Sequence, residues 1–206
     1  MRYRCTHSHG RNKAQRPFGT LRQSFIVQND PMATYRNRSD TVCFTGHRHI
    51  AAAKQPELIQ RLDGMLDALY RRGYRYFISG GAIGFDILAA ERVLAMQKQH
   101  PEMRLILALP CSDQSSLWNE RDCRRYERML YFSDETHVLS PAYYEGCMLT
   151  RNRFMVDHAA LCLCYMERMK GGTLSTVAYA LNANVPVINL AMEKQCAAFM
   201  QDSPTD

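Results

Sequence analysis

The sequence predicts an α/β fold: a Rossmann-like, doubly wound and mostly parallel sheet of about six strands, with helices on both faces. Short apolar segments alternate with longer amphipathic segments from residue 41 onward. The short segments are continuously apolar, which is typical of strands buried on both faces of a parallel sheet. With 206 residues, 46% of them hydrophobic, the chain is also long enough to bury one core.

The first half of the domain shows the alternation most clearly. The apolar segments 41–46, 74–79 and 104–110 predict strands, and the amphipathic segments 57–72 and 85–100 predict helices. Apolar side chains in both helical segments recur at helical spacing, so we expect them to face the core. These side chains are Leu58, Leu62, Met65, Leu66 and Leu69 in the first segment, and Phe85, Leu88, Ala89, Val93 and Met96 in the second.

The second half continues the pattern with three more strands and three more helices. The charged segment 117–132 has the length of a surface helix, and the last dozen residues suggest a helix turn followed by a polar tail. The predicted helices are 117–132, 151–159 and 173–183, and the predicted strands are 136–140, 160–166 and 186–191.

Charge divides the chain into three regions. Residues 1–38 carry eight Lys or Arg against Asp30 alone, so they hold the whole excess of the net charge of +6. Their low hydrophobicity and lack of periodicity predict a disordered basic extension, followed by one folded α/β domain over residues 39–195 and a polar tail over 196–206. Because Met32 lies just before the first strand, residues 1–31 are either an upstream extension or an arm that grips an acidic partner.

Composition excludes several classes of protein. No apolar run approaches the length of a membrane span and no hydrophobic signal segment is present, so we expect a cytoplasmic protein without a membrane partner. The eight cysteines are scattered without C-x-x-C spacing, which favours buried thiols over a metal or disulfide framework. His47 and His49 lack an accompanying acidic or cysteine cluster, so no metal is predicted. No cofactor is predicted either.

Glycines mark the place where a ligand is expected. In a doubly wound sheet, ligands bind beyond the carboxyl ends of the strands. The loops 45–49, 79–84 and 170–176 follow strands, and two of them contain Gly-Gly at or near a helix start. Such loops let backbone N–H groups approach a phosphate. The alternative is that the glycines only allow tight turns and close packing of helix on sheet. Neither the dinucleotide fingerprint nor a P-loop is present.

Side chains near these loops complete the candidate site. Asp86 is expected either to cap its helix or to contact a ribose, and Arg48 to contact an anion. Arg151 and Arg153 flank Asn152 at a predicted helix start, and their guanidinium groups suit a phosphate, whereas Trp118 is expected to cover the sheet rather than stack on a base. The candidate ligand-binding residues are Gly46, Arg48, Gly80, Gly81, Gly84, Asp86, Arg151, Asn152, Gly171, Gly172 and Thr173.

An ordered set of motifs resembles a known family. The segments TGHR (45–48), SGGAIGFD (79–86), YYEGC (143–147), RNRFMVD (151–157) and GGTLSTVAYA (171–180) together look like the YpsA-like proteins of the SLOG superfamily. The resemblance implies a Rossmann-like fold that binds a nucleotide-derived small molecule, and we therefore expect a nucleotide-binding protein that acts as a sensor. Related families often pair their subunits, which is consistent with a homodimer.

One branch of the superfamily, the LOG phosphoribohydrolases, suggests an alternative function as a nucleoside-monophosphate N-glycosidase. Its first motif is similar to Arg151 and Met155, with Asn152 in place of a lysine. Its second motif departs further, because Lys170 replaces a proline and residues 171–191 contain no glutamate. Cleavage of a glycosidic bond needs a carboxylate near the ribose. Here that role would fall to Asp86 or Asp157.

The second branch, the DNA-processing protein DprA, suggests single-stranded DNA binding. Its glycine-rich loop is similar to residues 79–86 and its Arg-Asn-Arg segment to residues 151–153. Continuous single-strand binding usually needs a positively charged track interleaved with aromatic side chains. A nucleic-acid partner is not favoured, because residues 39–206 are close to neutral.

Overall fold

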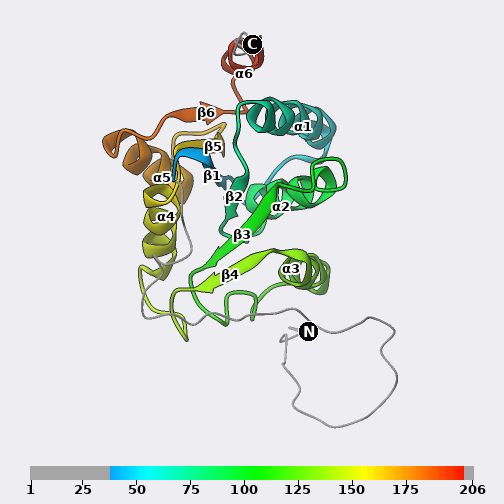
Figure 1. Cartoon of the computed structure of the whole chain (residues 1–206). Coiled ribbons are helices and arrows are strands. Elements are labelled where there is room, and N and C mark those ends of the chain that lie inside the picture. The colour runs from blue at the N-terminus through cyan, green and yellow to red at the C-terminus, as the bar shows by residue number, and fades with distance from the viewer. Residues whose placement is uncertain (1–37, 202–206) are drawn as a thin grey trace.

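The computed structural model describes residues 38–201 (Figure 1). The basic extension expected over residues 1–38 lies outside this range apart from Arg38, and so do residues 202–206. Six strands form one sheet in the order β4-β3-β2-β1-β5-β6, and every neighbouring pair is parallel. Helices cover both faces of this sheet (Figure 1). The predicted Rossmann-like, doubly wound α/β fold is confirmed.

The strands are short, and the central ones are buried because helices cover them on both sides. All five residues of β5 are buried, as are the first five of β1. Register is regular where these two strands pair, with Cys43 opposite Cys162 and Gly46 opposite Tyr165. The strands are β1 (Thr41–Gly46), β2 (Tyr76–Ser79), β3 (Arg104–Leu109), β4 (Glu135–Val138), β5 (Leu161–Tyr165) and β6 (Val187–Asn189).

The pleat of each strand sorts its side chains between two cores. Val42 and Phe44 pack in the larger core under α1, α2, α3 and α6, whereas Cys43 points to the opposite face under α4 and α5. Short 3₁₀ turns occupy Arg38–Asp40 and Ala52–Lys54. The helices are α1 (Gln55–Arg71), α2 (Phe85–Met96), α3 (Glu120–Phe132), α4 (Cys147–Asp157), α5 (Gly171–Asn182) and α6 (Glu193–Gln201).

The start of α4 differs from the sequence-based expectation. The helix begins at Cys147 rather than at Arg151, so Arg151 lies in its second turn and is not a helix-start residue. The reason is Gly146, whose left-handed backbone (φ 92°) turns the chain into the helix four residues earlier than the arginine. Arg151 therefore projects from the body of a packed helix.

The C-terminal segment is also more ordered than a helix turn and tail. Residues 196–201 belong to α6, with Cys196 buried and both Phe199 and Met200 packed against the larger core. Apolar contact with α1 explains why this segment continues as a helix.

Two further expectations concern the cysteines and membrane-spanning segments. Among residues 38–201, six cysteines are free and buried: Cys43, Cys111, Cys147, Cys162, Cys164 and Cys196. None of the helices within residues 38–201 is both long enough and apolar enough to cross a membrane.

The order of the strands brings distant loops together. From β1 the chain runs outward through β2 and β3 to β4, then returns by way of α4 to place β5 on the other side of β1. The strand order reverses between β1 and β5, so the loops that follow these two strands diverge and leave room between them.

Candidate functional site

A cavity of about 430 Å³ lies at the point where the strand order reverses. The loops that follow β1, β2 and β5 line it together with one side of α4, and this is the edge at which doubly wound folds bind ligands. Eight of the residues predicted from the sequence line the cavity: Gly46, Arg48, Asp86, Arg151, Asn152, Gly171, Gly172 and Thr173.

The structure adds five lining residues that sequence reasoning missed, namely Thr45, His47, Ala82, Met148 and Lys170. Met148 was missed because the sequence predicts that α4 starts at Arg151, three residues after it. Lys170 could have been found, because a cation directly before Gly-Gly is a recognisable signal for an anion site.

Gly80, Gly81 and Gly84 do not line the cavity, and each makes room for the protein's own atoms. A Cβ on Gly80 would lie 2.0 Å from Nη1 of Arg151 and 2.7 Å from Oδ2 of Asp86. A Cβ on Gly84 would lie 2.4 Å from the backbone oxygens of both His47 and Arg48. Gly81 is buried beside the side chains of α3. Tight turns and close packing therefore account for these three glycines.

Gly171 and Gly172 have the opposite environment. Both are exposed, and a Cβ on either would meet no atom within 4 Å. Gly171 adopts a left-handed backbone (φ 71°) as the first residue of α5. The first N–H groups of a helix have no partner within it and carry partial positive charge, so the start of α5 presents open, partially positive backbone to the cavity.

Arg151 is buried, and its guanidinium group makes hydrogen bonds within the protein. Its Nη1 donates to the carbonyl of Gly80, and its Nε donates to Oδ1 of Asn152 at 2.7 Å. Asn152 in turn donates to Oγ1 of Thr176 at 2.8 Å, and that hydroxyl donates to the carbonyl of Gly172 at 2.8 Å. Burial lowers the pKa of Arg151, and the nearby carboxyl of Asp86 opposes the shift. The arginine thus ties the β2–α2 loop to the start of α5.

The exposed cations at the cavity are Arg48 and Lys170, which come from the loops after β1 and β5. Both line the same cavity as Gly171 and Gly172 at the start of α5. The cavity therefore combines an open helix start with two accessible positive charges.

Asp86 is the carboxylate of the cavity. It lies in the first turn of α2 and is 5% exposed, but the residue at the N-cap is Gly84. Burial raises the pKa of Asp86 to about 6, while the Arg151 guanidinium and the backbone N–H groups of Ala82 and Gly80 oppose the rise. The side chain therefore interacts with the loop before the helix rather than capping it.

Comparisons with known proteins identify the fold family. The model of the YpsA family, described as the YspA SLOG family, matches residues 42–193, which is well over half of the chain. The chain belongs to this family. The predicted resemblance is confirmed, and the match covers every element that lines the cavity.

Relatives of this SLOG-family chain have been found in bacilli. The uncharacterized SPbeta prophage-derived protein YoqJ of Bacillus subtilis is 29% identical over 62% of this chain and 84% of its own length. A UPF0398 protein of Bacillus licheniformis is 26% identical over 64% of this chain and 76% of its own length.

Two solved structures share the fold of this SLOG-family chain. DNA processing protein A from Helicobacter pylori, described by its single-stranded DNA binding mode, superposes with a TM-score of 0.56 and 18% identity, covering 84% of this chain and 78% of that one. DNA processing protein A from Streptococcus pneumoniae gives a TM-score of 0.53 at 16% identity, covering 79% and 56%. At these identities the likeness concerns the fold alone.

Other candidates from the sequence have roles in packing within this SLOG domain. Trp118 packs against the larger core with its ring edge-on to Tyr126 at 5.2 Å, consistent with a cover for the sheet. The ring of His47 accepts hydrogen bonds from the backbone. Among residues 38–201, no group of three His, Cys, Asp or Glu side chains has a geometry that could hold a metal ion.

The pKa of Asp86 predicts how the stability of this SLOG-family chain depends on pH. The free energy of unfolding should fall as pH rises from about 4 to about 6, because folded Asp86 retains its proton above the unfolded value of 3.8. Two pKa units correspond to about 3 kcal/mol. Asp86→Asn should remove this dependence, and its stability relative to wild type should rise by that amount between pH 4 and pH 7.

Urea unfolding at a series of pH values measures the difference between wild type and Asp86→Asn. Asp157→Asn, which removes an exposed carboxylate from the end of α4, is the matched control. A difference between wild type and Asp86→Asn that stays constant from pH 4 to pH 7 would contradict the raised pKa.

Proposed function

We propose that the cavity at the switch point binds a nucleotide or a nucleotide-derived small molecule, and that the protein acts as a sensor of it. The observation that carries the proposal is the start of α5. Gly171 and Gly172 leave it open, and Lys170 and Arg48 line the same cavity and supply positive charge. This arrangement suits a phosphate group.

The rest of the cavity supports a ligand larger than phosphate alone. A volume of about 430 Å³ falls within the range of small-molecule sites. Asp86 lines the same cavity, and a buried carboxylate is a good acceptor for the hydroxyl groups of a ribose. In this arrangement the phosphate would lie at the start of α5 and the sugar near α2.

Mass spectrometry of the small molecules released from the natively purified full chain tests the proposal. We expect an intact nucleotide or derivative that rebinds to fresh protein and stays intact. A chain that releases no such molecule and binds none from a panel of nucleoside mono- and diphosphates in calorimetry would contradict it. Single-stranded DNA belongs in the same panel, because two fold neighbours are DNA processing protein A. DNA affinity that falls steeply with salt would favour a DNA site instead.

Gly172→Ala separates the ligand role of this glycine from its structural role. The added Cβ would stand in open space on a helical residue with an ordinary backbone, so we expect normal folding. The methyl group would stand between a phosphate and the helix start, and nucleotide affinity should fall about tenfold or more, corresponding to about 1.4 kcal/mol. Calorimetric titration measures the effect.

The control for Gly172→Ala is Ala178→Ser, an exposed position on the same helix. It should leave both folding and affinity unchanged. Equal nucleotide affinity in wild type and Gly172→Ala would exclude the start of α5 as the phosphate site.

A second function, nucleoside-monophosphate N-glycosidase activity, is favoured by one specific observation. The cavity contains the carboxyl of Asp86, and a pKa of about 6 suits general acid or base catalysis near neutral pH. Asp157, the other carboxylate considered from the sequence, is exposed, accepts a hydrogen bond from Tyr179 and does not line the cavity.

Incubation with nucleoside monophosphates followed by detection of free base distinguishes the two functions. Release of base that disappears in Asp86→Asn would establish the glycosidase with Asp86 as its carboxylate. Binding without release of base would support the sensor.

A further inference from the structure

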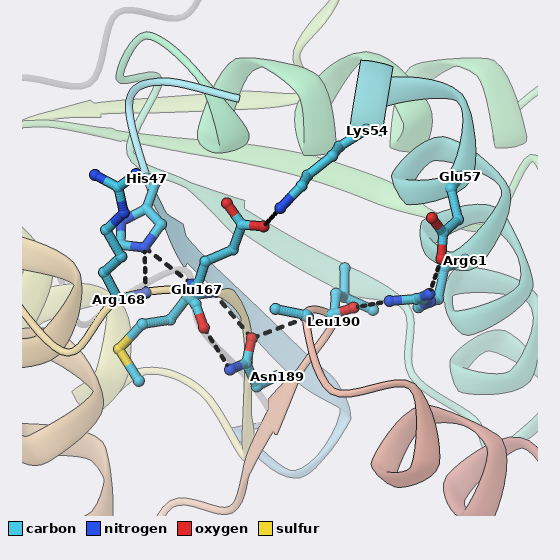
Figure 2. Close-up of polar contacts among 10 residues, drawn as sticks. His47, Lys54, Glu57, Arg61, Glu167, Arg168, Asn189 and Leu190 are labelled. Carbon is cyan, nitrogen blue, oxygen red and sulfur yellow. Dashed lines mark hydrogen bonds and ion pairs between the residues drawn. The ribbon is translucent and has the colours of Figure 1, made fainter. Parts of the chain in front are cut away.

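His47 lies at the junction of the loops that form the cavity. It follows β1, and Figure 2 shows its ring directed at the loop that follows β5. The Nε2 atom lies 3.0 Å from the backbone nitrogen of Glu167 and 3.1 Å from that of Arg168. Both nitrogens carry hydrogen, so Nε2 accepts both hydrogen bonds.

The backbone of His47 makes two further connections. Its N–H donates to the carbonyl of Tyr165 at 3.1 Å, and its carbonyl accepts from the N–H of Phe85 at 3.1 Å. One residue therefore joins the end of β1, the start of α2 and the first part of the β5–α5 loop, from Tyr165 to Arg168. Gly84 permits this because its missing Cβ leaves room for the His47 carbonyl.

The segment that His47 holds leads directly to the proposed phosphate site. Glu167 and Arg168 lie just before Lys170, which is the N-cap of α5. The position of their backbone therefore affects where the start of α5 lies at the cavity. The same segment is also contacted through the ion pair between the side chains of Glu167 and Lys54 (Figure 2). That pair is exposed, and exposed ion pairs contribute little to order.

We infer that His47 is a positioning residue: through the two hydrogen bonds accepted by Nε2 it fixes the β5–α5 loop, and thereby the helix start that binds the ligand. This inference rests on the proposed function. His47 acts through the backbone of Glu167 and Arg168. Its contribution is to keep Lys170 and the first N–H groups of α5 aimed at one place, so that no ordering cost is added when the ligand binds.

The test compares His47→Ala with His47→Gln. Alanine removes the acceptor, whereas the Oε1 atom of glutamine can reach the place of Nε2 and accept the same hydrogen bonds. Hydrogen exchange reports on the amides of Glu167 and Arg168 in the free full-length protein, and calorimetry with AMP reports on the cavity. We expect at least tenfold faster exchange of both amides and at least tenfold weaker AMP binding in His47→Ala, with both effects largely reversed in His47→Gln.

Two controls isolate the role of Nε2. His49→Ala removes an exposed imidazole from the same loop, and Lys54→Met removes the ion pair to Glu167. Neither should change exchange or affinity. The inference is overturned if His47→Ala leaves exchange or AMP affinity unchanged, if His47→Gln behaves like alanine, or if Lys54→Met reproduces the alanine effect.

The two readouts also separate this inference from the proposed function. Exchange is measured without ligand, so it shows whether His47 holds the loop whatever the cavity binds. Failure of the wild-type protein to bind AMP or any other nucleotide would overturn the proposed function and the ligand part of the inference together, while the exchange result for the loop would remain.

Discussion

Gly84→Ala is expected to destabilise the domain by more than about 4 kcal/mol, a loss that threatens folding itself. The added Cβ would lie 2.4 Å from the backbone oxygens of His47 and Arg48 and 2.5 Å from Cα of Arg48. Backbone atoms cannot rotate away as the end of a long side chain can. The positive φ of 96° adds strain for any residue with a Cβ.

Gly73→Ala provides the matched control for this prediction. Gly73 also has a positive φ, 89°, but a Cβ added there would meet no atom within 4 Å. Its replacement should cost about 1–2 kcal/mol, the strain of the backbone alone. Unfolding in urea compares the two variants, and equal losses would show that the loop after β1 can move aside from α2.

Arg151→Met should cost about 3 kcal/mol of stability, because it removes a buried cation from a set of buried polar groups. The carbonyl of Gly80 would lose the Nη1 donor, and the carboxyl of Asp86 would lose the charge that opposes the rise of its pKa. An arginine at a helix start that only bound phosphate would behave differently. Its loss would lower the affinity for the ligand and leave the free energy of unfolding unchanged.

Arg153→Met is the control, since Arg153 is exposed two residues further along α4, with its guanidinium 5.6 Å from the ring of Tyr179. The double variant Asp86→Asn/Arg151→Met should recover part of the loss, because it removes the carboxyl left behind. Additive losses in thermal or urea unfolding would show that the two buried groups are not coupled.

The fold could be predicted because the spacing of apolar residues along the chain depends directly on which side chains are buried. Segments such as TVCFTG and LCLCY are apolar throughout because both faces of each strand are covered, and the helices between them carry apolar side chains at helical spacing. The boundaries that were missed depend on single residues. Gly146 starts α4 by adopting a left-handed backbone, a choice that the composition of the helix does not reveal.

Only part of the candidate site was predicted from the sequence. The loops at 45–49 and 170–176 line the cavity as a pair because β1 and β5 are neighbours in the sheet. The glycines at 80, 81 and 84 have the same sequence signature but face protein atoms. A glycine in such a loop indicates that a Cβ would not fit there. The sequence does not show whether atoms of the protein or of a ligand fill the space that the Cβ would take.

The sequence by itself determined that the chain alternates strands and helices, that its glycine-rich loops follow strands, and that these loops therefore lie on the ligand-binding edge of a parallel sheet. These properties are local, since they depend on the order of residues and on their spacing. Only the tertiary structure decided that β5 pairs with β1, that Arg151 is buried against Gly80, and that His47 accepts hydrogen bonds from the loop before α5. The physical reason is that each of these contacts joins segments far apart in the chain, and their formation depends on how the whole core packs.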